Sequence, residues 1–220
     1  MTSRRYEAGS SAAGLCRRRS RHAKRSGEGG FSLIELLVVI ALILILSTMY
    51  WGSTSNSRRR QQQAACRSNL QKIYVALQIY ANDHGGAFPQ VSGARTSEEP
   101  LSELVPRYTA DTSVFICPGS GDSALPSGEP LRGRRISYAY LMGRYATNTQ
   151  EVLMSDRQVD ARAKKAGEQA FSPTGKPPGN NHGSGGGNFL FVDGHAEATP
   201  AQLPFSLGLS AGVTLLNPRP

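Results

Sequence analysis

Residues 29–46 read GGFSLIELLVVIALILIL. One acidic residue, Glu35, lies five positions after Gly30, and eleven consecutive apolar residues, 36–46, follow it. On an insertion scale, a carboxylate at the centre of a membrane helix costs about 2.5–3.5 kcal/mol, and each Leu, Ile or Val returns about 0.3–0.6 kcal/mol. The apolar residues therefore offset the carboxylate, and we expect the segment to insert. An acid retained inside such a segment usually marks a specific partner.

Two simpler interpretations fit an apolar segment that follows a basic leader, here residues 1–30. A secretory signal peptide would place a small-residue cleavage site after its apolar core, but residues 47–51 read STMYW and contain no Ala-x-Ala pattern. An ordinary signal anchor is the second alternative, because residues 31–51 have about the length that a bilayer requires. Neither alternative explains an acid so close to the start of the apolar run.

The charge distribution predicts the orientation of the chain. Residues 1–30 contain eight of the 25 Lys and Arg residues and two acidic residues, so they carry +6 of the formal net charge of +9. Basic flanks remain in the cytoplasm, and the three arginines at 58–60 are outnumbered. We therefore expect a cytoplasmic N-terminus. Because the leader accounts for most of the basic excess, the charge does not indicate nucleic-acid binding.

The junction around Gly30 closely resembles the processing site of type IV prepilins and type II secretion pseudopilins. The resemblance implies that a prepilin peptidase cuts after Gly30 and that the new N-terminal residue, Phe31, is N-methylated. It also implies that Glu35 pairs with the N-terminal amine of a neighbouring subunit. The protein would then be a single-pass protein of the bacterial inner membrane with a periplasmic head, which a secretion or pilus assembly machinery builds into a fibre.

Two functions follow from this resemblance and from the apolar segment. The one we expect is a structural pilin-like subunit, or pseudopilin, of a type II secretion system or a type IV pilus-like fibre. It would contact other pilin or pseudopilin subunits through its N-terminal helix. The alternative is a membrane-tethered module that binds a periplasmic or extracellular ligand and does not polymerise. The two differ at Glu35, because a tether requires only the apolar run.

The rest of the sequence predicts an α+β protein, in which a long N-terminal helix packs on a small antiparallel sheet. Residues 58–80 contain no Gly or Pro, and apolar residues recur there at three- and four-residue steps, as in an amphipathic helix. Poor helix formers at 52–57 predict a bend or a locally melted turn. We divide the chain into a leader (1–30), a membrane and assembly half of the helix (31–51), an amphipathic half (52–86) and a head (87–220).

Short runs of β-prone residues predict the strands of the head. They occupy residues 113–117, 136–141, 151–154 and 188–198. In the last run, Asp193-Gly194 separates two β-prone segments, which is a strong hairpin signal and predicts a type I′ turn.

The head carries a second resemblance. Residues 66–89, 115–118 and 181–195 are similar to pilin-like proteins of the processing-associated class, whose signature is a His, nine residues and then Asp-Gly. Here ten residues separate His182 from Asp193-Gly194. We interpret the additional residue as an insertion in a glycine-rich loop, where extra length costs little.

Two cysteines, Cys66 and Cys117, lie outside the leader. In an oxidising periplasm, the simplest use of an even pair is a disulfide between the helix and the sheet. Two buried free thiols are the alternative. A zinc site is less favoured, because the sequence contains no Cys-x2-Cys and no closely spaced Cys–His pair.

The sequence gives little indication of catalysis. The acid and imidazole groups that sequence proximity suggests as a cluster are Asp156, His182, Asp193 and His195. No nucleophile with a base, and no three ligands at a defined spacing, accompany them. We therefore expect a protein that is not an enzyme and needs no cofactor. Calcium is a weaker expectation, with Asp156 and Asp193 as ligands and the asparagines at 180, 181 and 188 as further oxygen donors.

Overall fold

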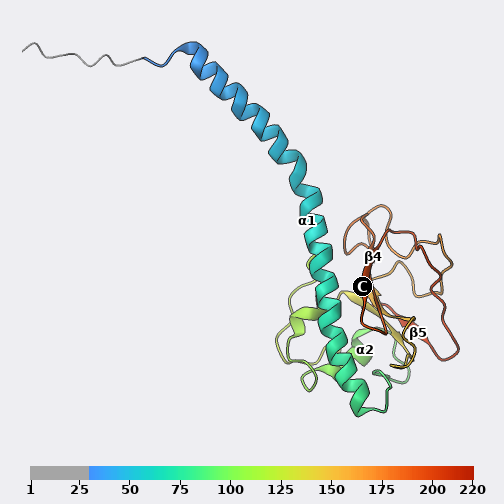
Figure 1. Ribbon diagram of the computed structural model, residues 1–220. Coiled ribbons are helices and arrows are strands. Elements are labelled where there is room, and N and C mark those ends of the chain that lie inside the picture. Colours follow the sequence, from blue (N-terminus) through green and yellow to red (C-terminus); the bar gives the residue numbers. More distant parts are fainter. Residues whose placement is uncertain (1–29) are drawn as a thin grey trace, which may run out of the picture. The chain divides into compact units, whose positions relative to one another are not determined.

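The computed structural model describes residues 30–220, and for residues 49–56 it describes the backbone alone (Figure 1). Apart from Gly30, the predicted basic leader therefore lies outside the described residues. The chain divides into two units at residues 48 and 49, and the described part of the first unit is residues 30–48. Helix α1 (Leu33–Asp83) contributes residues to both.

In the first unit, α1 exposes apolar side chains all around its axis. The large apolar side chains from Phe31 to Leu46 have exposed fractions between 41% and 81%. A helix that is apolar on every side is one that another apolar medium or protein surface must cover. Within the described residues, no helix meets both the length and the apolarity required to cross a membrane.

Helix α1 is continuous through residues 52–57. The predicted locally melted turn is therefore wrong. A glycine inside a helix costs only about 1 kcal/mol relative to alanine. Extending a helix that already exists also avoids the unfavourable nucleation step. The helical residues on both sides therefore keep residues 52–57 helical.

The second unit contains one five-stranded sheet in the order β4-β3-β2-β1-β5, with every neighbouring pair antiparallel. The strands are β1 (Tyr138–Met142), β2 (Val152–Asp156), β3 (Gly187–Phe191), β4 (Ala196–Thr199) and β5 (Thr214–Leu216). Three short helical segments precede them: α2 (Glu98–Leu101), η1 (Ser102–Leu104) and η2 (Thr112–Phe115). The predicted α+β class is confirmed.

The run at 113–117 does not form the predicted strand. It begins inside η2, where the carboxylate of Asp111 accepts a hydrogen bond from the backbone N–H of Ser113 at 3.1 Å. Asp side chains that bind nearby backbone groups favour turns and helix starts over sheet pairing. The local cap therefore outweighs the β-prone composition.

The predicted hairpin between β3 and β4 is present, but its turn differs from type I′. The backbone N–H of Gly194 donates to the carbonyl of Phe191 at 3.0 Å, and the N–H of Phe191 donates to the carbonyl of His195 at 3.0 Å. The loop therefore contains three residues, and Gly194 has a φ of 89°. A three-residue loop with glycine in the left-handed region is a common alternative to the two-residue turn.

Both faces of the sheet are covered. On one face, the stripe of α1 that includes Leu70, Ile73 and Leu77 is fully buried in a core with β-strand residues. On the other face, a second core joins phenylalanines of β3 to Leu203 and Leu207, which follow β4. β3 contributes to both cores, with Leu190 in the first and Phe189 in the second.

Candidate functional site

The two cysteines outside the leader join α1 to the segment that follows η2. Cys66 and Cys117 form a disulfide, and both residues are at most 1% exposed. Fifty-one positions separate them in the sequence. In the chain-entropy model, a loop of this size stabilises the folded state by about 4 kcal/mol. Because the sulfurs are buried, a reductant reaches them only when the head opens.

His182 lies directly against this disulfide. Its Nε2 is 3.5 Å from Cys117 Sγ and 3.2 Å from Asp156 Oδ2, and the side chains of His182 and Asp156 are fully buried. Asp156 ends β2, and His182 belongs to the glycine-rich loop before β3. The structure therefore places Asp156 and His182, two members of the cluster suggested by sequence proximity, next to a cysteine that was selected for a different reason.

Amide donors surround the buried carboxylate of Asp156. Its Oδ2 accepts hydrogen bonds from the backbone N–H of Asn188 at 2.7 Å and from Asn188 Nδ2 at 2.9 Å. Its Oδ1 accepts from Asn181 Nδ2 at 2.9 Å. A buried carboxylate is strongly unfavourable unless its oxygens are satisfied in this way. The sequence analysis considered these asparagines only as oxygen donors to calcium and missed their role as N–H donors.

Asp193 lies in a different environment, in the exposed turn between β3 and β4. Its Oδ1 accepts a hydrogen bond from the backbone N–H of His195 at 3.0 Å and lies 2.6 Å from His195 Nδ1. The backbone hydrogen bond, with help from the ring, holds the pKa of Asp193 below its ordinary value. Asp193 and His195 therefore form a hydrogen-bonded pair that is separate from the buried contact of His182 with Asp156.

Asp156 and Asp193 lie at opposite ends of β3. Asp156 contacts Asn188 near the start of the strand, whereas Asp193 follows its end. Five residues of strand span about 16 Å, while Ca²⁺ holds its oxygen ligands at about 2.3–2.6 Å. One calcium ion cannot bind both carboxylates.

The Asp-Gly part of the signature packs on α1. Tyr74 donates from its hydroxyl to the carbonyl of Val192 at 2.8 Å. A Cβ atom at Gly194 would lie 2.5 Å from the ring of Tyr74. Gly194 thus allows the ring to approach the backbone closely. His182 and Gly194, at the two ends of the signature, both lie against residues that attach the head to α1.

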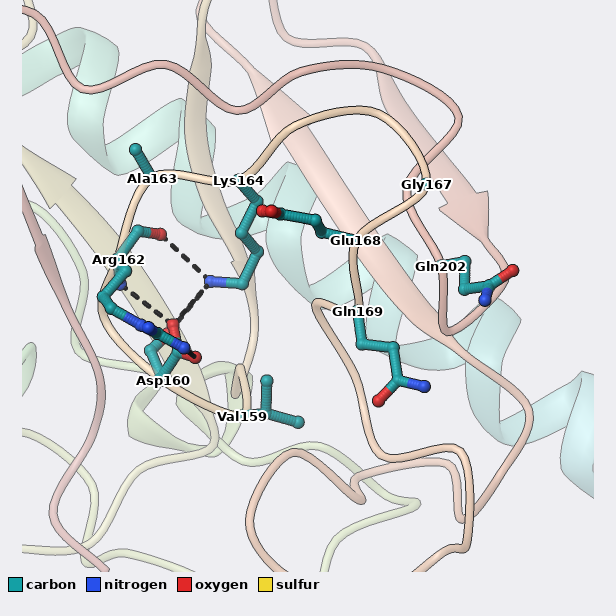
Figure 2. Close-up of a pocket in the computed structure, with 9 residues that line it drawn as sticks. All are labelled: Val159, Asp160, Arg162, Ala163, Lys164, Gly167, Glu168, Gln169 and Gln202. Atoms are coloured by element: carbon teal, nitrogen blue, oxygen red, sulfur yellow. Dashed lines mark hydrogen bonds and ion pairs between the residues drawn. The ribbon is translucent and has the colours of Figure 1, made fainter.

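A polar pocket of about 500 Å³ lies on the surface of the head (Figure 2). Lys164 Nζ is 3.0 Å from Asp160 Oδ1 and 3.0 Å from the carbonyl of Arg162, as the dashed lines in Figure 2 show. Hydrogen bonds, first that from Arg162 and then that from Lys164, hold the pKa of Asp160 well below its ordinary value. The charged side chains of Asp160, Arg162 and Lys164 therefore stabilise the conformation of the loop that contains them.

The residues of the predicted processing site lie at the start of α1. Glu35 is in the first turn of the helix and is exposed. A carboxylate is favourable there, because the backbone N–H groups of a helix start carry partial positive charge. Within the described residues, its carboxylate makes no hydrogen bond or ion pair. Phe31, two residues before the helix, is 71% exposed.

Comparison with protein-family models gives a match for this segment. Residues 25–51 match the prokaryotic N-terminal methylation motif. Comparisons with curated proteins and with solved structures give no match. The matched range includes Gly30, Phe31 and Glu35. The chain therefore carries the N-terminal cleavage and methylation motif of type IV pilin-like and pseudopilin-like precursors, the class of proteins that prepilin peptidase processes.

Proposed function

We propose that the chain is the precursor of a structural pilin-like subunit, a pseudopilin of a type II secretion system or a subunit of a type IV pilus-like fibre. Prepilin peptidase removes the leader after Gly30, Phe31 is N-methylated, and the mature subunit joins other pilin subunits through the start of α1. The observation that carries this proposal is the match of residues 25–51 to the methylation motif. The protein is neither an enzyme nor dependent on a cofactor in this role.

The surface of the first unit supports assembly through α1. A helix that exposes apolar side chains on all sides, from Leu33 to Leu46, is unfavourable in water. Before assembly, the inner membrane would cover these side chains, with the basic leader on the cytoplasmic side and the head in the periplasm. In the fibre, the same side chains would contact equivalent helices of neighbouring subunits. Both environments remove the apolar surface from water.

The head suits a subunit that must remain folded outside the cytoplasm. A disulfide, two apolar cores and a continuous five-stranded sheet hold it together. A pocket of about 300 Å³, lined by prolines including Pro177, Pro178 and Pro218, favours the alternative of a tethered ligand-binding module. In that alternative, α1 anchors the head without polymerising.

Mass spectrometry of the mature N-terminus tests the proposal. The full-length chain is expressed in a host that contains a prepilin peptidase, and the membrane fraction is analysed. We expect a chain that begins at N-methyl-Phe31. Gly30→Leu is expected to retain the leader, and it should not disturb the described fold, because no heavy atom of residues 30–220, chain neighbours aside, lies within 4 Å of a Cβ placed at Gly30.

The control variant is Gly208→Leu, at another glycine with open space around its Cβ position but outside the motif. It should be processed like the wild type. A wild-type chain that keeps its leader in the presence of active peptidase, or that is cleaved after Trp51, would contradict the proposal. Cleavage after Trp51 would indicate an ordinary signal peptide.

A further inference from the structure

Four potential metal ligands meet at one buried point of the head. They are the sulfurs of Cys66 and Cys117, the imidazole of His182 and the carboxylate of Asp156. One ligand atom from each lies within 4.8 Å of all the others, and all four residues are buried. They come from α1, from the segment after η2, from the end of β2 and from the loop before β3. The fold, and not local sequence, assembles this set.

The spacing of these atoms fits a small tetrahedral ion. Zinc binds sulfur at about 2.3 Å and nitrogen or oxygen at about 2.0–2.1 Å, so neighbouring ligands of one tetrahedron lie about 3.5 Å (S and N) and about 3.3 Å (N and O) apart. His182 Nε2 is 3.5 Å from Cys117 Sγ and 3.2 Å from Asp156 Oδ2. The imidazole nitrogen therefore already has the distances to both neighbours that a shared ion would require.

The surroundings also contain polar atoms that lack partners. His182 Nδ1, Asn181 Oδ1 and Asn188 Oδ1 are buried and make no hydrogen bond within the described part of the chain. Buried polar atoms are normally paired, and an unpaired group calls for a water, an ion or a functional role. Three such atoms gather around the His182–Asp156 contact.

We propose that the head has a second covalent state, in which Cys66 and Cys117 are reduced and bind Zn²⁺ together with His182 and Asp156. A disulfide sulfur is a poor ligand, whereas two thiolates, an imidazole and a carboxylate form a four-coordinate set that suits zinc. The disulfide and the zinc ion exclude one another. Either one joins α1 to the rest of the head at the same place.

Conversion of the disulfide state to the zinc state requires a two-electron reductant. A phosphine and one water molecule react with the disulfide, the S–S bond breaks, and phosphorus supplies two electrons. The oxygen of water goes to phosphorus to give the phosphine oxide, and its two hydrogens give the two thiols. Zn²⁺ then displaces the two thiol protons, which pass to the solvent, because only thiolates bind the metal.

The residues around Asp156 suit a ligating carboxylate. Its Oδ1 is already oriented by Asn181 Nδ2, and its Oδ2 by the backbone N–H of Asn188. Such outer contacts fix the direction of a ligand and are important for metal affinity. Asn188 Nδ2 also donates to the carbonyl of Gln63 on α1 at 3.2 Å. The ligand set is therefore held from both sides of the junction between α1 and the sheet.

Metal analysis of the reduced full-length chain in detergent tests the proposal. The protein is unfolded, reduced with a water-soluble phosphine, refolded with Zn²⁺ and freed of excess metal by gel filtration. We expect one zinc ion per reduced chain and none on the oxidised chain. Refolding with Co²⁺ should give the visible absorption of a tetrahedral site and a near-ultraviolet thiolate-to-cobalt band.

Two histidine variants form a matched pair. His182→Gln should weaken zinc binding by about 100-fold or more, since even the loss of an outer contact costs 10–100-fold. His195→Gln should bind as the wild type does, because His195 pairs with Asp193 in the exposed turn. A reduced wild-type chain without zinc, or a cobalt complex without the thiolate band, would overturn the proposal without any variant. Equal zinc affinity of His182→Gln and wild type would also overturn it.

This proposal does not rest on fibre assembly. A chain that binds zinc but is not processed after Gly30 would contradict only the proposed function, and a processed chain that binds no zinc would contradict only the zinc site.

Discussion

Glu35 is the residue at which the two proposed functions differ most. Its carboxylate belongs to a segment whose other side chains are almost all apolar and exposed. In a bilayer, an unpaired carboxylate gives a monomer a penalty of up to about 3 kcal/mol at the centre of a helix. Its place in the first turn reduces that penalty. In a fibre, the N-terminal amine of an adjacent Phe31 would neutralise it, so the carboxylate favours the polymer over the monomer.

We therefore expect Glu35→Leu to insert into the membrane as well as the wild type and to assemble poorly. The measurement is subunit crosslinking and recovery of sheared fibres at matched expression. Leu44→Ile is the control, because Leu44 is 65% exposed on the same helix and has no charge. Assembly of Glu35→Leu at the wild-type level would show that the carboxylate has no role in the fibre, which would favour the tethered module.

Among the elements, the hairpin of β3 and β4 depends on how closely it approaches α1. Gly194 combines a φ of 89° with a Cβ position only 2.5 Å from the ring of Tyr74. An added methyl group would strain the backbone and push the ring away at the same time. The hydrogen bond from Tyr74 to Val192 would then lengthen.

Gly194→Ala should lower the free energy of unfolding by about 1–3 kcal/mol, the range typical of an overpacked site. Gly208→Ala is the matched control, because its φ is not in the left-handed region and, chain neighbours aside, no heavy atom of the part of the chain that the structure describes lies within 4 Å of its Cβ position. Its effect should stay within about 0.5 kcal/mol. Denaturant unfolding of both variants measures the difference, and equal midpoints would show that the turn tolerates a side chain.

The same elements show where sequence reasoning succeeds and where it fails. The stripe of Leu70, Ile73 and Leu77 is visible as a three- and four-residue period, and the structure buries it. The strand β5 has no such signal, because three residues are too few to show a period. At 113–117, composition favoured a strand, but the backbone N–H and the hydroxyl of Ser113 both donate to the carboxylate of Asp111, and this local cap favours η2.

For the candidate site, the limit of sequence reasoning is distance along the chain. His182 and Asp156 are twenty-six positions apart, and His182 and Cys117 are sixty-five apart. Sequence proximity grouped Asp156 and His182 with Asp193 and His195, but no spacing rule joins His182 to Cys117, and the absence of a close Cys–His pair argued against zinc. Only the antiparallel pairing of β2 with β3 places Asp156 beside Asn188 and the loop that holds His182.

At the scale of the whole molecule, the disulfide controls how firmly α1 is attached to the head. We expect Cys66 and Cys117 to be bridged in the exported protein, which peptide mapping without reductant detects. Replacing both by serine should lower the free energy of unfolding by about 2–5 kcal/mol. The control is Ser184→Ala, at an exposed loop position. Two thiols that react with an alkylating reagent in the native protein would contradict the bridge.

The order of the strands has a consequence for crowded subunits. The outermost strands of the sheet are β4, with four residues, and β5, with three. Edge strands this short offer few unpaired backbone N–H and C=O groups to a strand from another molecule. Short edge strands thereby protect proteins from edge-to-edge aggregation. In a fibre of the kind proposed, heads at high local concentration would therefore remain separate folded domains, and aggregation through their sheets would not compete with fibre growth.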